Sequence, residues 1–416
     1  MRRLKLVAVL ALLLANVAVA ADAAPAGREL ALDEAIKLAI ADQPLVRAFE
    51  SDATASEEAA VAARSLPDPQ VSVGIQNLPI TGMSALSPTD DEMTMYTIGV
   101  MREQVRRSQR EAQAAQLRSE AAVSRFQGSA QQRIVQRDVM IAWIEAVEAR
   151  SKQRLLAQVI SDLRTGQKVM EAGVSTGASN TALALQAQAE VSFAESELAD
   201  ARGSEGRARG ELRRWIGADA DRALPDSLPS LALPQGVAPD FSDHPEVLAV
   251  NAEEEAARRQ IDVAQSERRP NISWSVMLGI RPSYGQMASA QVSIPFQLNR
   301  RNLQDRRIAE AQARAYSARL RAEDKRRELA GAYEQALADY RSADARMKEI
   351  RERAIPSLES SFKAAEARYA GGQGTLELPL NIVRRYVEAN IQLVEQEGAR
   401  ARAAAMLLYL AGEMVQ

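Results

Sequence analysis

The feature that most constrains this chain is a pair of short alternating segments set between very long stretches of helical composition. In residues 271–280 every second side chain is apolar, and after a turn containing Pro282 and Gly285 the residues 288–294 alternate in the same way. A period of two is typical of a β-strand, and two such runs around a turn predict a hairpin. Because a lone hairpin cannot bury its own apolar face, the chain needs further strands or another apolar environment.

The first half of the chain contains a second hairpin of the same kind. Val71, Val73 and Ile75 alternate with small or polar residues, and a loop at 77–92 leads to a returning strand at 93–101. The sequence therefore predicts four strands in total, two in each half of the chain.

Long helices surround both hairpins. The pattern is helical at 30–64, with a break near Pro44, and again at 102–170, where no proline occurs. At about 1.5 Å per residue the second of these helices would be on the order of 100 Å long. A further helix runs to Trp215, and a Pro-rich linker follows at 224–239.

The two halves of the chain are copies of one unit. Four landmarks occur twice in the same order, with an offset that drifts slowly: Pro44 and Pro245 (245 − 44 = 201), Pro69 and Pro270 (201), Gly173 and Gly371 (198), and Gly217 and Gly412 (195). Such order predicts an internal duplication in which each half reads helix, hairpin, long helix, Gly-rich turn, helix. We expect a first repeat at 29–217 with its hairpin at about 70–101, a linker at 218–240, a second repeat at 241–412 with its hairpin at about 271–296, and a short tail at 413–416.

The beginning of the sequence resembles a secretory signal. Basic residues precede a short apolar run and the small residues Ala18-Val-Ala20, which predicts a signal peptide at 1–20. The sequence contains no cysteine, so we expect neither a disulfide nor an N-terminal lipid anchor.

Composition excludes several classes of partner. Basic and acidic residues are interleaved and give a net charge of −3, so nothing points to nucleic acid. After the leader, no apolar run reaches the roughly 18 residues that a membrane helix needs. Any contact with a membrane would therefore be made by the strands.

Four strands with alternating faces resemble part of a membrane barrel but cannot close one. Barrels begin at about eight strands, and unpaired edges are not tolerated in lipid, so several chains would have to contribute strands. The side chains expected to face the membrane share the apolar phase of the alternation: Val71, Val73, Ile75, Ile272, Trp274, Val276, Val292 and Ile294.

At the level of motifs the sequence resembles the outer-membrane factor family, the TolC-like channels of tripartite efflux systems. The resemblance covers about 29–412, and it is most specific at Arg368-Tyr-Ala-Gly-Gly372, followed by Thr375-Leu-Glu-Leu and Asn381. LPDPQVSVGIQNLP from Leu66, IGVMREQ from Ile98 and VSIPFQLNRRNLQDR from Val292 are most similar to the heavy-metal, CzcC/CusC-like branch.

The resemblance implies a fold and a set of partners. The fold would be mainly α with a small β part, with three chains sharing a 12-stranded outer-membrane β-barrel that continues as a periplasmic α-helical barrel. The homotrimer would sit in the outer membrane of a Gram-negative bacterium, contact its lipid, and dock on a periplasmic adaptor and an inner-membrane resistance-nodulation-division (RND) pump.

The resemblance also assigns roles to two turns and a gate. The turns that would contact adaptor or pump comprise Gly173, Val174, Ser175, Thr176, Gly177, Gly371, Gly372, Gly374 and Thr375. Some relatives carry acidic rings at the periplasmic constriction. Here the matching positions are Leu378 and Asn381, with Glu377 beside them, and these three form the candidate gate.

The implied function is passive efflux, with heavy-metal cations as the expected cargo, no catalytic residues and no cofactor. Two alternatives stay open: the same channel serving drug efflux or type I secretion, and a periplasmic coiled-coil adaptor or scaffold without a pore. Gly173-Val-Ser175-Thr-Gly177 matches the GxSxG nucleophile pattern, but that chemistry requires a strand before the serine and a histidine base. The only histidine, His244, precedes Pro245 and is expected to be a solvated residue at a helix start.

Methionines are concentrated in the hairpin regions. Six of the 12 methionines lie there: Met83, Met93, Met95, Met101, Met277 and Met287. Thioethers are soft ligands suited to Cu(I) or Ag(I). Methionine is also an adaptable apolar side chain that could simply fill a barrel wall.

Overall fold

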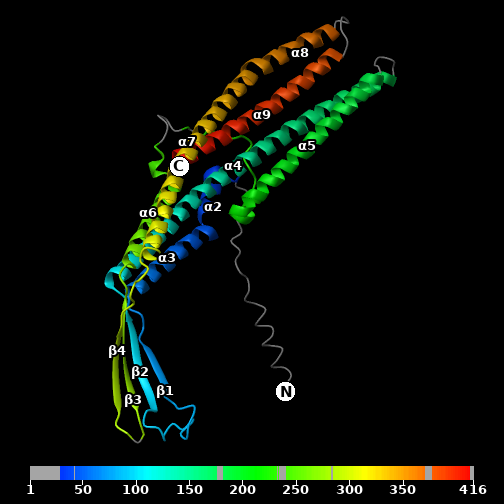
Figure 1. The fold of residues 1–416 in the computed structure, drawn as a ribbon. Helices are drawn as coiled ribbons and strands as arrows, with labels where there is room; N and C mark the ends of the chain where they lie inside the picture. The colour runs from blue at the N-terminus through cyan, green and yellow to red at the C-terminus, as the bar shows by residue number, and fades with distance from the viewer. Residues whose placement is uncertain are drawn as a thin grey trace, which may run out of the picture.

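The computed structural model describes residues 29–41, 43–175, 181–231, 233, 240–282, 284–370 and 377–412. The predicted signal peptide at 1–20 and the tail at 413–416 lie outside the described residues. Figure 1 shows an elongated molecule with a narrow sheet at one end and long helices extending from it.

The first half of the chain contains helices on both sides of one hairpin. In order, its elements are α2 (Leu32–Ala41), α3 (Pro44–Arg64), β1 (Gln70–Gln76), β2 (Met95–Gln104), α4 (Arg107–Ser175), α5 (Thr181–Ile216) and the short helix η1 (Gly217–Asp221). The predicted break near Pro44 is confirmed, because α2 ends and α3 begins there. The long helix begins later than predicted, since residues 102–104 remain paired with the second hairpin.

The second half repeats the order of helix, hairpin, long helix and helix, but it begins with a short helical turn where the first half has α2, and its long helix is interrupted. Its elements are η2 (Phe241–Asp243), α6 (Pro245–Ser266), β3 (Ile272–Ile280), β4 (Met287–Ser293), α7 (Gln304–Glu349), the π-helical turn η3 (Ile350–Ala354), α8 (Ile355–Ala370) and α9 (Glu377–Ala411). The long helix of the first half is continuous over 69 residues. Its counterpart is divided into α7 and α8 by the π-turn.

The four strands form one antiparallel sheet in the order β1-β2-β3-β4. The two hairpins are joined where β2 pairs with β3, with Ile98 opposite Leu278 and Val100 opposite Val276. The duplicated, mainly helical fold with a small sheet is thus confirmed. No helix in the described part of the chain has an apolar stretch long enough to span a bilayer.

Buried side chains at a spacing of seven residues run along two of the long helices. On α5 they include Ala187, Ala194, Ala201 and Ala208, and on α7 they include Ala315, Ala322, Leu329, Ala336 and Ala343. A strict seven-residue repeat makes helices wind around each other with a left-handed supercoil. Because nearly all of these side chains are alanines, the helix axes can approach closely along these seams.

The largest side-chain core lies where α2, α4, α5 and α9 meet. Trp143 of α4 is its central residue, and its indole Nε1 donates a hydrogen bond to the Leu30 carbonyl at 2.9 Å. Leu212 of α5 and Leu408 of α9 pack in the same cluster. This core therefore joins the two repeats.

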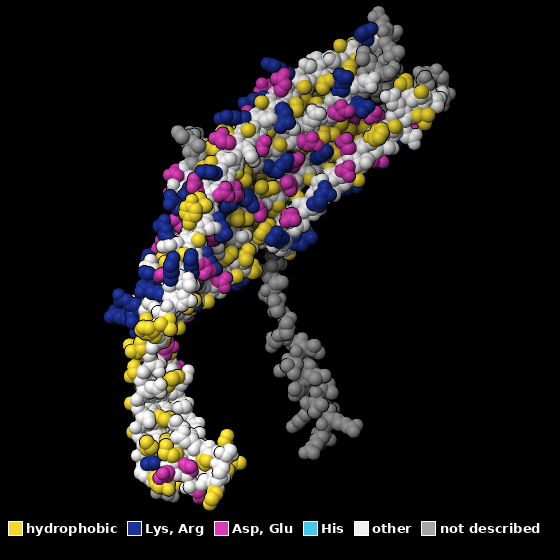
Figure 2. Space-filling view, in the orientation of Figure 1, with side chains coloured by type: hydrophobic (Ala, Val, Ile, Leu, Met, Phe, Trp, Pro, Cys, Tyr) yellow, Lys and Arg dark blue, Asp and Glu magenta, His cyan; other side chains and the backbone are white. Residues whose placement is uncertain are grey.

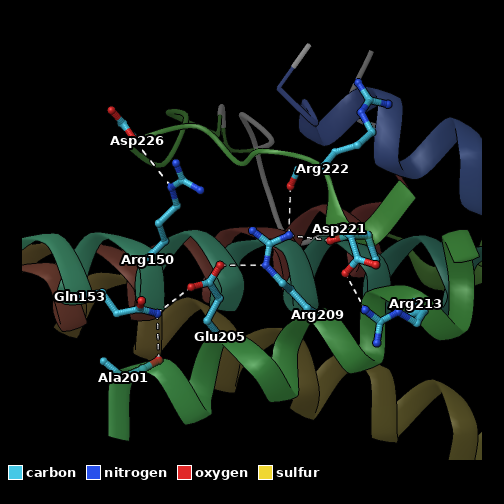
Figure 3. Close-up of polar contacts among 10 residues, drawn as sticks. Arg150, Gln153, Ala201, Glu205, Arg209, Arg213, Asp221, Arg222 and Asp226 are labelled. Atoms are coloured by element: carbon cyan, nitrogen blue, oxygen red, sulfur yellow. Dashed lines mark hydrogen bonds and ion pairs between the residues drawn. The ribbon is translucent and has the colours of Figure 1, made fainter. Parts of the chain in front are cut away.

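The beginning of the expected linker belongs to the folded body. Leu224 is fully buried in the core around Trp143. Figure 3 shows how polar contacts hold this segment: the Arg209 guanidinium donates to the carbonyls of Ala220 (2.6 Å) and Arg222 (3.0 Å), and pairs with Glu205 at 2.8 Å. The segment is thus anchored on α5 before it crosses to the second repeat.

Candidate functional site

The sheet has one strongly apolar face, fixed by the strand register. On this face Val73 lies opposite Ile98, which lies opposite Leu278. The other apolar members are Val71, Ile75, Tyr96, Val100, Ile272, Trp274, Val276, Ile280, Ala288, Ala290 and Val292. Their exposure is high for such side chains, with Val73 79% and Val292 65% accessible in the single chain.

The predicted membrane-facing side chains lie together on this surface. The register places seven of them on the apolar face, and the eighth, Ile294, directly follows β4 and is also exposed. An exposed apolar surface that continues over four strands is unfavourable in water and marks a contact with lipid or protein.

The opposite face carries small and polar side chains together with methionine. Ser275 lies between Met101 and Gln291, and Gly99 lies opposite Met277. Figure 2 shows that charged side chains of both signs cover the helical part, whereas the sheet carries few between its ends. The two faces thus differ as the two sides of a barrel wall do.

Arg281 holds the outer end of the sheet, away from the helices. Its Nε donates to the Gly285 carbonyl at 2.7 Å, within the turn between β3 and β4. Its Nη1 donates to the Glu92 carbonyl at 3.1 Å, in the loop that precedes β2. One side chain therefore connects the turn of one hairpin to the loop of the other.

The helix ends that flank the predicted tip turns lie at the other end of the molecule. Gly173, Val174 and Ser175 form the end of α4. The helix therefore extends to the third residue of the GVSTG motif, past the glycine at which the sequence predicted its end. The remaining tip residues, Thr176, Gly177, Gly371, Gly372, Gly374 and Thr375, lie outside the described residues. Figure 1 shows the α4/α5 and α8/α9 ends on the same side of the molecule.

The candidate gate residues begin α9. Glu377 and Leu378 are the first two residues of that helix, and Asn381 is exposed one turn later. Their assignment as a gate stays a prediction, because their neighbours in the tip are outside the described residues.

Ion pairs join the two helical hairpins beneath the tips. Lys152 Nζ of α4 contacts Glu395 Oε1 of α9 at 2.8 Å, and Arg402 of α9 pairs with Glu148 of α4. The Glu148 carboxylate lies where Gly398 has no side chain; a Cβ there would overlap it. Burial raises the pKa of Glu148 even though Arg402 opposes the change.

These charged side chains line a groove of about 680 Å³ formed by α4, α5 and α9. Glu145 of α4 and Asp200, Arg207 and Glu211 of α5 also belong to its charged lining. Both pairs are only partly buried, and Glu148 is the least exposed of the four side chains. Removal of Arg402 would leave the Glu148 carboxylate without its partner in this groove. We therefore expect the position of the α4/α5 helical hairpin relative to the α8/α9 helical hairpin to depend on these charged side chains.

Pro356 explains the π-turn between α7 and α8. Proline lacks an N–H and its ring clashes with the carbonyl four residues earlier, here that of Glu352. The preceding turn is widened, and the Ile355 N–H bonds to the Ile350 carbonyl five residues back. The sequence contained this signal, since no proline occurs at the corresponding place in α4.

The expectation that His244 is solvated was wrong. His244 is 5% exposed and caps α6, where its Nδ1 accepts from the Glu246 N–H at 3.3 Å. Its ring packs edge-on against Tyr409 with centroids 5.3 Å apart. Burial lowers the pKa of His244, and burial together with a hydrogen bond to Glu246 raises the pKa of Tyr409.

Neither the GxSxG motif nor an acidic cluster forms a reactive centre in the described part of the chain. Ser175 ends a helix, whereas a nucleophile elbow requires a strand before the serine. Among the described residues, no group of three or more His, Cys, Asp and Glu side chains could hold a metal ion. Methionine thioethers are a separate class of ligand.

Comparisons with known proteins agree with this geometry. Residues 242–413 match the family described as outer membrane efflux protein. A comparison with curated proteins found no match.

Several solved structures share the fold over nearly the whole chain. CusC, studied for its transmembrane channel formation, is 17% identical with a TM-score of 0.76, covering 92% of both chains. VceC from Vibrio cholerae is 18% identical with a TM-score of 0.75, covering 92% of this chain and 96% of its own. The channel CmeC from Campylobacter jejuni is 12% identical with a TM-score of 0.76, covering 92% and 85%.

Proposed function

We propose that this chain, whose residues 242–413 match the outer membrane efflux protein family and whose fold is that of outer-membrane channels, is a channel subunit of a tripartite efflux system. It would be a passive duct and not an enzyme. The energy for transport would come from an RND pump in the inner membrane, reached through a periplasmic adaptor.

The observation that carries this proposal is the exposed apolar face of the sheet. Val73, Val276 and Val292 are more than half exposed in the single chain, and they lie on one continuous surface. At about 25 cal/mol per Å² of apolar surface, leaving such a face in water is costly. Contact with lipid removes that cost, and the small and polar face then lines a water-filled lumen.

The edges of the sheet support a trimer. In the described chain β1 and β4 each pair on one side only. In lipid these edges must be satisfied, so the β4 strand of one subunit would pair with the β1 strand of the next. Three copies supply 3 × 4 = 12 strands, enough to close a barrel.

The helical end would provide docking and gating. The turns at 173–177 and 371–375 would contact the adaptor or pump, and Glu377, Leu378 and Asn381 would form the constriction. The resemblance of the hairpin motifs to the heavy-metal branch supports metal cations as cargo over drugs or a secreted polypeptide. A scaffold without a pore is less well supported, because it leaves the apolar face unexplained.

The test combines channel recording with a pair of substitutions on opposite faces of β3. Wild-type protein extracted in detergent should form trimers and discrete channels in planar bilayers. Val276→Arg places a charge in lipid near the middle of the strand and should cost about 2–4 kcal/mol per subunit, so trimers and channels should be lost.

Ser275→Arg is the matched control, since Ser275 is the adjacent residue on the polar face. It should leave trimers intact and alter only conductance or ion selectivity. A wild-type protein that stays a soluble monomer, or equal tolerance of both substitutions, would overturn the assignment of the faces and of the channel.

A further inference from the structure

The loop at 77–94, between β1 and β2, exposes large apolar side chains at the outer end of the sheet. Ile80 and Leu86 are 78% and 70% accessible in the single chain, and Met83 is fully exposed. These three side chains lie within seven residues of each other and form what we call the loop surface. An exposed apolar surface of this kind marks a contact with protein or membrane.

The backbone of the loop holds the loop surface in place. Thr94 Oγ1 donates to the Asn77 carbonyl at 3.0 Å and closes the base of the loop. The Leu86 N–H donates to the Pro79 carbonyl at 2.7 Å, and Leu86 has a φ of 60°, in the left-handed region that residues with a Cβ rarely adopt. Such strained positions cluster at sites of function. The loop therefore fixes Leu86 in an unfavourable conformation that leaves its side chain exposed.

The two ends of the loop lie on different sides of it. The last residues approach the β3–β4 turn of the same chain, where Arg281 Nη1 donates to the Glu92 carbonyl at 3.1 Å. The first residues follow β1, which is an edge strand of the sheet. Figure 1 shows the loop projecting beyond β1, on the side away from β2, β3 and β4.

The strand directions decide what would lie beside the first part of the loop. All pairs in the sheet are antiparallel, so β1 ends with Gln76 at the same outer end where β4 begins with Met287. In the proposed ring, β1 pairs with β4 of the next subunit. The loop would therefore leave the sheet directly beside the β3–β4 turn of that subunit. This turn also exposes apolar side chains, because Tyr284 and Met287 are both more than 40% accessible.

We propose that residues 80–86 of each subunit pack on the β3–β4 turn of the next subunit and join the subunits at the outer mouth of the barrel. The contact would remove the loop surface, together with Tyr284 and Met287 of the turn, from water. The inference rests on the proposed channel function, since it requires a ring of subunits. Each turn would be held by its own loop through Arg281 and by the neighbouring loop through apolar contact.

Cross-linking between engineered cysteines tests the contact, because the chain has no cysteine of its own. Met83→Cys combined with Tyr284→Cys should be joined by a short bis-maleimide in the detergent-extracted trimer, and denaturing gels should show linked dimers and trimers. The matched control is Glu92→Cys with Gly285→Cys, since both carbonyls bind Arg281 within one chain. A Cβ at Gly285 meets only the Arg281 side chain, at 3.9 Å, so the control pair should fold and be linked as a monomer.

The lifetime of the trimer gives a second measurement. Met83→Ser combined with Leu86→Gly should make heated trimers dissociate at least about tenfold faster, since two large apolar side chains are lost from the contact. Glycine adopts a φ of 60° without strain, so this variant should still fold. Met93→Ser is the matched control, because Met93 is exposed in the last part of the same loop, and it should leave the rate unchanged.

Three results would overturn the contact: cross-links confined to monomers or missing, equal dissociation of the Met83→Ser/Leu86→Gly and wild-type trimers, or ready labelling of Met83→Cys by a maleimide confined to the membrane. The last result would show that lipid covers the loop surface. Native mass and conductance of the wild type separate the two proposals. Trimeric channels without the cross-link refute only the loop contact, whereas absence of trimers and channels refutes the proposed function.

Discussion

The two halves of this chain share one order of elements but differ in the continuity of their long helix. The first half contains α4, unbroken over 69 residues, whereas the second contains α7 and α8 on either side of a π-turn. Pro356 accounts for the difference, because the first half has no proline in its long helix. The two halves therefore contain similar helical hairpins, but a single proline interrupts the long helix of the second.

A second difference lies at the start of the helix that precedes each hairpin. Gln43 and His244 occupy corresponding positions before Pro44 and Pro245, and both are buried. The Gln43 amide donates to the Ala39 and Trp215 carbonyls and has no charge at any ordinary pH. His244 can gain a proton, so the second half contains a pH-sensitive position that the first half lacks.

The largest effect is expected when a proline is placed in the long helix of the first half. With the offset of 198 found at the glycine turns, Pro356 corresponds to Gln158 (356 − 198 = 158), an exposed residue of α4. Gln158→Pro should destabilise the protein by about 3 kcal/mol or more, since the continuous helix loses a hydrogen bond and gains a clash. Thermal unfolding measures the loss, and Gln158→Ala is the control, expected to change stability little.

The converse change should make the second half resemble the first. Pro356→Ala restores a backbone N–H and removes the ring, so we expect the π-turn to revert to α-helix and stability to rise by about 1 kcal/mol. Hydrogen exchange should become slower over residues 350–355. Unchanged exchange there would mean that packing against α9, and not Pro356, produces the π-turn.

The smallest effect concerns the buried histidine. Because burial lowers the pKa of His244, its contribution to stability is complete above its ordinary pKa of about 6.5 and is lost as the pH falls below that value. His244→Gln should remove this part of the pH dependence, an effect on the order of 1 kcal/mol. Melting curves between about pH 7.5 and 5 test this, and Gln43→His should add a similar dependence in the first half.

The strands and the duplication could be predicted from the sequence because both depend on local order. Alternation identified both hairpins, and the paired landmarks from Pro44 to Gly412 predicted the order of the elements. The start of α4 could not be predicted in this way. Residues 102–104 are polar or charged and suit a helix, but pairing with β3 keeps them extended.

The site was less predictable, because it depends on contacts between distant segments. The sequence contained the hairpin methionines, but only the cross-strand register shows that Met95, Met277 and Met287 share one face. His244 was expected to be solvated because it precedes Pro245 at the start of a helix. Its burial comes from Tyr409, which lies far away in the second repeat and reaches it only through the fold.

The unpaired edges of β1 and β4 have a genetic consequence. If the proposed ring of three subunits closes only when every edge strand pairs with an intact neighbour, a chain with a damaged β4 edge would prevent closure of each trimer that it enters. In cells that make equal amounts of damaged and intact chains, only about one trimer in eight would contain three intact copies. An edge defect should therefore behave as a dominant allele, whereas a defect that prevents the chain from folding at all should be recessive.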